Sequence, residues 1–340
     1  MYSFRNDYSE GVHPKVLAAL TETNLIQTVG YGCDPYCTDA ADLIRRLCDA
    51  PEAEVHFLVG GTQTNLVVLD ALLASYESVI TAHTGHINVH ETGAIEATGH
   101  KVCTVPSPDG KLTPELVDTV LQGHSSEHMV LPRVVYISDT TEVGTVYTKA
   151  ELTALRAYCD AHGLYLFLDG ARLGAALTSP ENDLTLPDLA RLTDAFYIGG
   201  TKNGLLFGEA LVMTVPCPHF RWHMKQRGAI LAKGRLLGVQ FHAILENELY
   251  FDLARHANDL AFRLRDGIAA LGYPFPVPSP SNQQFPVLPN GVVAKLQELG
   301  YEFEIDYAVD ADHTCIRLVT SWATPETAVE QFLKDLEALG

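Results

Sequence analysis

The chain has 340 residues, which is long enough for a large α/β domain and a smaller one. It carries 23 basic and 42 acidic residues, for a formal net charge of −19, and 47% of its residues are hydrophobic. A surface this acidic repels nucleic acid and anionic membranes, so neither is expected as a partner. The polar first residues do not resemble a signal peptide, and no run of about 18 apolar residues predicts a membrane span.

The cysteines indicate neither a metal site nor a disulfide framework. There are seven, an odd number, and they are scattered along the chain. Cys33 and Cys37 are close together, but no second pair completes a zinc quartet. We therefore predict no metal site and a reducing, cytoplasmic location.

Short apolar runs alternate with segments of helical periodicity through the first two thirds of the chain. The predicted strands are 54–60, 78–82, 100–105, 132–138, 164–169 and 194–200, and the predicted helices between them include 62–76, 112–123 and 148–163. This alternation predicts a mainly parallel sheet covered by helices on both faces.

The remaining segments suggest how the chain divides. We expect an N-terminal arm over 1–20, a large domain over 21–245, and a connecting helix with a small C-terminal α/β domain over 246–340. A long helical pattern covers 238–271, and a segment with five prolines, 274–286, is predicted to be a linker.

Three polar features follow predicted strands, at the sheet edge where α/β proteins bind ligands. Asp169 ends one strand and Lys202 follows another, while a glycine turn, 60–63, leads from a strand into a helix. Taken singly, Asp169 is explained as the cap of a helix beginning at Gly170, Lys202 as a solvated charge, and the turn as a structural one. Together they supply what pyridoxal phosphate requires: a lysine for the Schiff base, a carboxylate for the ring nitrogen and a phosphate cradle.

With these features in place, the sequence resembles the threonine aldolase group of the fold-type-I pyridoxal-phosphate enzymes, the β-eliminating lyase-like family, over nearly its whole length. Six segments carry the resemblance in the family's order: FRNDYSEGVHP (4–14), VGYGCDP (29–35), GTQTNL (61–66), HINVHETGA (86–94), DGARL (169–173) and IRLVTSW (316–322). The resemblance implies the pyridoxal-phosphate-dependent transferase fold, with a mainly parallel seven-stranded sheet between helices and a small C-terminal α/β domain.

The resemblance also assigns roles to residues. Lys202, Asp169 and His86 are the expected catalytic residues, with His86 stacking on the cofactor ring and serving, directly or through water, as the base. The expected cofactor-binding residues are Gly61, Thr62, His86, Asp169, Arg172, Lys202, Arg227 and Lys233. The expected substrate-binding residues are Asn6, Tyr31, His128, Arg172 and Arg317.

The sequence departs from the family at three of these places. The segment around the Schiff-base lysine is TKNGL (201–205), and Glu142 replaces a histidine often found after the strand 132–138. The usual Met-Arg-Gln segment is QRGAILAKGRLLG (226–238), so Arg227 and Lys233 are both candidates for the phosphate-binding cation, either in their own subunit or at the cofactor of a neighbouring one.

The implied reaction is retro-aldol cleavage of a β-hydroxy-α-amino acid of the threonine or allo-threonine type to glycine and an aldehyde. The alternatives are β-elimination, decarboxylation or transamination with the same cofactor, and a catalytically silent pyridoxal-phosphate-binding scaffold. The family also implies a homodimer or homotetramer with shared active sites.

Overall fold

The computed structural model describes residues 2–340. Within this range the first two thirds of the chain form a seven-stranded sheet in the order β1-β7-β6-β5-β4-β2-β3. Strands β2 to β6 run parallel, whereas β7 is antiparallel to both of its neighbours. The strands are β1 (Glu54–Leu58), β2 (Glu77–Ala82), β3 (Lys101–Val105), β4 (Leu131–Ser138), β5 (Tyr165–Asp169), β6 (Ala195–Gly199) and β7 (Glu209–Met213).

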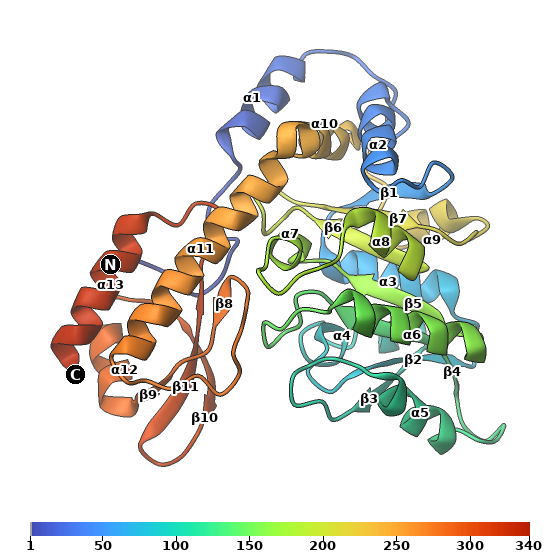
Figure 1. The fold of residues 1–340 in the computed structure, drawn as a ribbon. Coiled ribbons are helices and arrows are strands. Elements are labelled where there is room, and N and C mark those ends of the chain that lie inside the picture. Colours follow the sequence, from blue (N-terminus) through green and yellow to red (C-terminus); the bar gives the residue numbers. More distant parts are fainter. Residues whose placement is uncertain (1) are drawn as a thin grey trace.

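Helices cover both faces of this sheet (Figure 1). They are α2 (Pro35–Leu47), α3 (Gly61–Leu72), α4 (His86–Val89), α5 (Pro114–Gly123), α6 (Lys149–His162), α7 (Leu173–Leu177), α8 (Leu186–Leu192), α9 (Phe220–Gln226) and α10 (Arg235–Leu245). A short 3-10 helix, η1 (Glu96–Thr98), precedes β3. Capping residues mark where several of them begin; for example, the Thr113 hydroxyl accepts a hydrogen bond from the Leu116 N–H, and Pro114 is the first helical residue.

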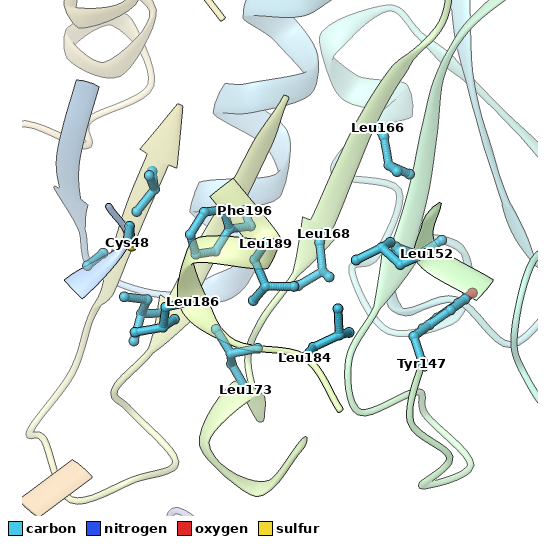
Figure 2. Packing of buried hydrophobic residues seen from close by; sticks show 14 of the residues in the cluster. Cys48, Tyr147, Leu152, Leu166, Leu168, Leu173, Leu184, Leu186, Leu189 and Phe196 are labelled. Atoms are coloured by element: carbon cyan, nitrogen blue, oxygen red, sulfur yellow. The ribbon is translucent and has the colours of Figure 1, made fainter. Parts of the chain in front are cut away.

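Alternating side chains of the central strands enter separate cores on the two faces. On β5, Leu166 and Leu168 pack with helices α6 and α8, whereas Phe167 packs on the opposite face with the cluster that includes α3. Figure 2 shows Leu166, Leu168 and Phe196 of the sheet beside Leu152 and Leu189 of those helices. Burial on both faces explains why these strands are continuous apolar runs, and it confirms the predicted mainly parallel sheet between helices.

The last third of the chain forms a smaller layer built on a second sheet. Its strands are β8 (Gln283–Gln284), β9 (Val287–Pro289), β10 (Glu304–Ala308) and β11 (His313–Val319). Strands β8, β9 and β10 each pair with β11 in the antiparallel direction. Helices α11 (Leu249–Ala270), α12 (Asn290–Glu298) and α13 (Glu326–Leu339) pack on it (Figure 1). None of the helices formed by residues 2–340 is both long and apolar enough to cross a membrane.

The N-terminal segment joins this smaller layer. Phe4 is fully buried in its core, and the Phe4 backbone bonds to Glu302 and Val319. The chain then continues past the large sheet to α1 (Pro14–Thr23), which packs on α10. The first residues therefore connect the two layers within one subunit.

Two predictions from local pattern are wrong. The helix expected over 238–271 is two helices, α10 and α11, separated by a 3-10 turn, η2 (Glu246–Glu248), in which Asn247 and Glu248 have positive φ. The proline-rich linker expected over 274–286 contains β8, and Ser281, Gln283 and Gln284 in it are fully buried. Its prolines prevent helix, but Ser279, Ser281 and Gln284 are hydrogen-bonded to one another, and the Asn282 amide donates to Asp7 and to the Thr320 carbonyl. The segment is therefore an ordered part of the structure.

Candidate active site

The carboxyl ends of the parallel strands and the N-terminal segment enclose a cavity of about 300 Å³. Its lining comes from six parts of the chain far apart in sequence. The polar lining residues are Tyr8, Thr62, His86, Ser138, Thr140, Glu142, Asp169, Arg172, Tyr197, Thr201, Lys202 and Glu209. A second cavity of about 520 Å³ shares Tyr8, His86, Glu142, Arg172 and Lys202 with the first and extends to Arg317.

Asp169 is buried at the end of β5 and accepts hydrogen bonds at both carboxylate oxygens. The Tyr136 hydroxyl (2.5 Å) and the Asn65 amide (2.9 Å) donate to Oδ2, while the Tyr197 hydroxyl and the Ala171 N–H (3.0 Å) donate to Oδ1. Burial by itself raises the pKa of Asp169, but His86 and these donors outweigh it and hold the pKa below its ordinary value. Asp169 is therefore a fixed buried anion.

The alternative explanation of Asp169 as a helix cap does not fit the backbone. The following helix, α7, begins at Leu173 and not at Gly170, and Arg172 is its N-cap residue. Gly170 serves close packing instead, because a Cβ there would lie 1.8 Å from the Tyr197 carbonyl oxygen. The bond from the Ala171 N–H shapes the turn, but the other three donors direct the carboxylate into the cavity.

His86 begins the short helix α4 above this carboxylate. Its Nδ1 lies 2.8 Å from the Glu91 carboxylate, and that same Glu91 oxygen accepts the Asn65 amide at 2.7 Å. Since Asn65 also donates to Asp169, one buried chain of hydrogen bonds fixes His86 and Asp169 relative to each other. The His86 ring is thereby held over the cavity.

Lys202 lies after β6 and reaches the same cavity. Burial and the nearby Arg172 charge lower the pKa of its ammonium. A neutral amine is the form that attacks a carbonyl, so the environment favours a nucleophile. Glu209, at the start of β7, is buried close by; burial raises the pKa of its carboxyl to about 8, and Thr201 donates to it at 3.1 Å.

The glycine turn before α3 lines the same cavity as Lys202. Gly60 is the N-cap of α3 in an extended conformation, and Gly61 and Thr62 are the first residues of the helix. A twelve-residue helix presents free N–H groups and a positive dipole end here. A Cβ on Gly61 would lie 3.0 Å from the Tyr197 hydroxyl, so glycine keeps the cavity open beside Asp169.

Arg172 is fixed by a residue that the sequence did not single out. Its Nε and Nη2 donate to the two carboxylate oxygens of Asp7, at 2.8 and 3.1 Å, and leave Nη1 free of that pair. Asp7 is 1% exposed and also accepts the Asn282 amide at 3.0 Å. This pair joins the N-terminal segment, the large sheet and the segment before β8 at the edge of the cavity.

We expect Asp7→Ala to lower the free energy of unfolding by about 3–5 kcal/mol, because it leaves the Arg172 charge buried without its partner. Urea denaturation at neutral pH measures this loss. Burial raises the pKa of Asp7, but the Arg172 and Lys202 charges outweigh it and lower the pKa. The contribution is therefore complete above the unfolded pKa of about 3.9 and is lost as the pH falls through the folded pKa, so the two proteins should converge in acid. Equal stability at neutral pH would contradict the assignment.

Arg317 projects from β11 into the wider cavity. Its Nε–H is buried and has no hydrogen-bond acceptor among residues 2–340, and burial together with the Arg172 charge lowers the pKa of its guanidinium. Two guanidinium groups near each other, one with an unsatisfied buried donor, are suited to a ligand carboxylate. The structure thus brings Arg317 and Arg172 to one cavity, although they lie in different layers.

Other predicted site residues lie away from both cavities of their own chain. Arg227 is paired with Asp70 at 2.6 Å, and Lys233 is exposed between α9 and α10. His128 is exposed in the loop before β4, and the Asn6 side chain accepts bonds from Tyr8 and Ser9 within its own turn. Tyr31 is half-exposed, with the Lys225 ammonium 5.0 Å from its ring centre.

Several residues of the site were missed by the sequence analysis. Asn65, Glu91, Tyr136 and Tyr197 hold Asp169 and His86, while Asp7 holds Arg172. Tyr136 and Tyr197 occur in apolar strands, where a tyrosine is expected simply to pack. Asp7 is next to Asn6, which the sequence analysis selected as a substrate-binding residue, but only the fold shows that Asp7 faces Arg172.

These residues fit pyridoxal phosphate. Asp169 is an anion fixed by four donors, Lys202 is an amine with a lowered pKa, and the α3 N-terminus with Gly61 gives an anion space without a side chain. The buried Arg317 Nε has a donor to offer an amino-acid carboxylate. These four groups therefore match, in turn, the ring nitrogen, the aldehyde and the phosphate of that cofactor and the carboxylate of its substrate.

Comparisons with known proteins agree with this geometry. Residues 4–289 match the family described as beta-eliminating lyase. A low specificity L-threonine aldolase from a Pseudomonas species is 33% identical over 99% of this chain and 97% of its own. The solved structure of a Leishmania major threonine aldolase is 51% identical, covers 100% of this chain and 99% of its own, and has a TM-score of 0.98. A Thermus thermophilus aspartate aminotransferase, at 17% identity over 99% of this chain and 91% of its own, shares the fold with a TM-score of 0.72.

Proposed function

Because the chain belongs to the β-eliminating lyase family, we propose that it is a pyridoxal-phosphate-dependent aldolase that cleaves β-hydroxy-α-amino acids of the threonine type to glycine and an aldehyde. The observation that carries the proposal is the joint lining of one cavity by Lys202, Asp169, His86 and the α3 N-terminus. The 33% and 51% identities over the full chain to threonine aldolases support this reaction above the others of the cofactor.

The chemistry of each side chain indicates its role toward the cofactor or the substrate. Pyridoxal phosphate, when bound, supplies an electrophilic carbonyl carbon and a ring that withdraws electrons from a bond at the substrate's Cα. Lys202 would provide the amine that holds the carbonyl carbon, and Asp169 would keep the ring nitrogen protonated. His86 would cover the ring, and Gly61 and Thr62 would bind the phosphate through backbone N–H groups. Arg317 and the free edge of Arg172 bind the substrate carboxylate.

The direct experiment is a glycine-release assay of the pyridoxal-phosphate-loaded protein with a panel of β-hydroxy amino acids. Threonine, allo-threonine and β-aryl serines of both configurations at Cα make up the panel. We expect glycine and the matching aldehyde in equal amounts from at least one of them. Release of an α-keto acid or of carbon dioxide instead would indicate β-elimination, transamination or decarboxylation, and binding with no turnover would indicate a silent scaffold.

We also propose that the protein is at least a dimer with active sites completed by a neighbour. Large apolar side chains are exposed beside α1, α9 and α10, among them Leu25 at 92% and Trp222 at 71%. Apolar side chains exposed to this extent are characteristic of subunit interfaces. Arg227, which is paired with Asp70, and Lys233 line neither cavity of their own chain, and we infer that they act at the site of a second copy.

Mixing two inactive variants tests this arrangement. If Arg227 acts on the neighbour's cofactor, a mixed dimer of Lys202→Ala and Arg227→Ala subunits has one intact site of two. Random exchange makes half of the dimers mixed, so about a quarter of the wild-type activity should return. The unmixed variants are the controls. No recovery after proven exchange, or a fully active monomer by light scattering, would contradict the proposal.

A cytoplasmic location completes the proposal. All seven cysteines are free, and six of them are buried as thiols. Free thiols are the usual state of cysteine in reducing compartments, which supports this location.

A further inference from the structure

The proposed reaction requires a base for the β-hydroxyl proton, and the inference below rests on that function. A β-hydroxy amino acid carries an amino group, a carboxylate and a hydroxyl within three adjacent carbons. Lys202 marks the position of the amino group, and Arg172 with Arg317 marks that of the carboxylate. The hydroxyl must therefore lie where the two cavities meet, near these three residues.

Three other groups line both cavities: Tyr8, His86 and Glu142. Tyr8 is 54% exposed on the N-terminal segment, so its position is the least defined. His86 has Nδ1 committed to Glu91, and its ring is needed flat against the cofactor. Glu142 is the carboxyl group of the three, and it comes from the turn directly after β4.

The Glu142 carboxyl is aimed by hydrogen bonds to one of its oxygens. Oε1 accepts the backbone N–H of His86 and the hydroxyl of Ser138, both at 2.8 Å. Oε2 accepts no hydrogen bond from residues 2–340. It is also not one of the fully buried polar atoms that lack a partner, so it is accessible from the cavity that Glu142 lines. The bond to the His86 N–H places the carboxyl on the side of the cavity that His86 covers.

We propose that Glu142 is the catalytic base that removes the β-hydroxyl proton during Cα–Cβ cleavage. The proton passes from the hydroxyl to Oε2, and the O–H electron pair becomes the second bond of the aldehyde C=O. The Cα–Cβ bond breaks, and its electron pair stays at Cα, where the cofactor withdraws it. Cα then takes up one proton to give glycine, and Glu142 returns its proton to solvent, so no oxidant or reductant is needed.

The surroundings of Glu142 suit this role. Burial, followed by the negative charge of Asp169, raises the pKa of the Glu142 carboxyl, while the Ser138 bond opposes the rise. A carboxylate with a raised pKa is a stronger base than an ordinary one. The role that the sequence gave to His86 then reduces to contact with the cofactor ring.

Glu142→Gln tests the proposal because glutamine retains the acceptor at Oε1 but cannot take a proton. With pyridoxal-phosphate-loaded protein, we expect cleavage of the best β-hydroxy substrate to fall at least about 100-fold in kcat. Exchange of the glycine Cα hydrogen with D₂O needs no hydroxyl base, so NMR should show it within about threefold of wild type. The absorbance spectrum of the bound cofactor should be unchanged.

Ser138→Ala is the matched control, since it removes one hydrogen bond to Oε1 and leaves the base; we expect a loss below about tenfold. Parallel loss of cleavage and exchange in Glu142→Gln would show a positioning role and overturn the inference. Full cleavage activity in that variant would overturn it as well. A wild-type protein that exchanges glycine but cleaves no β-hydroxy amino acid would instead defeat the proposed function, and with it the inference.

Discussion

Lys202→Ala should purify folded but without the visible absorbance of enzyme-linked pyridoxal phosphate, and its glycine release should fall at least about 10³-fold. Alanine lacks the amine that holds the cofactor's carbonyl carbon. Because Lys202 lies at a cavity and its side chain supports no core packing, the fold should survive. Ultraviolet–visible spectroscopy, circular dichroism and the glycine assay measure the three quantities.

Chemical trapping identifies the lysine independently of activity. Borohydride reduction of the loaded wild-type protein should fix the cofactor on the peptide that contains Lys202. Lys101→Ala is the control and should be labelled on the Lys202 peptide like the wild type, because Lys101 is exposed on the edge strand β3, away from the cavity. Labelling of another lysine would refute the assignment of Lys202.

Asp169→Asn should keep most of the cofactor affinity and lose activity by about 10³-fold or more, because a neutral amide does not keep the ring nitrogen protonated. Asp169 is buried, so bulk solvent does not replace the lost charge. Titration with pyridoxal phosphate and steady-state kinetics separate binding from turnover. The same substitution tests the capping explanation, since asparagine is also a good helix cap and would leave activity intact.

Tyr197→Phe is the matched control for Asp169→Asn. It removes one of the four donors to the carboxylate but keeps the charge and the packing of the ring. We expect a loss of about tenfold at most, the size of one hydrogen bond to a charged group. If Tyr197→Phe were as damaging as Asp169→Asn, the charge of Asp169 would not be the important property.

Local pattern was sufficient for the central sheet because strands β2, β4, β5 and β6 are buried on both faces. Leu166, Phe167 and Leu168 are all apolar for that reason, and their chemistry marks them as strand without reference to the rest of the chain. The same reasoning failed over 274–286. A segment rich in proline and polar residues looks like a linker unless its contacts are known. Those contacts, the pairing of β8 with β11 and the Asn282 bond to Asp7, join it to distant parts of the chain.

The sequence by itself determined the family, six of the seven strands of the large sheet and the positions of Asp169, Lys202 and the glycine turn at strand ends; the seventh strand, β7, was expected only from the resemblance. It did so because helix and strand periodicity, and the motifs at the carboxyl ends of strands, are local in the chain. The tertiary structure alone decided that Asp7 clamps Arg172, that Asn65 links Asp169 to Glu91 and His86, and that Glu142 faces the place of a substrate hydroxyl. These contacts join residues from 5 to 165 positions apart, and their energies depend on burial and direction, which exist only after the chain has folded.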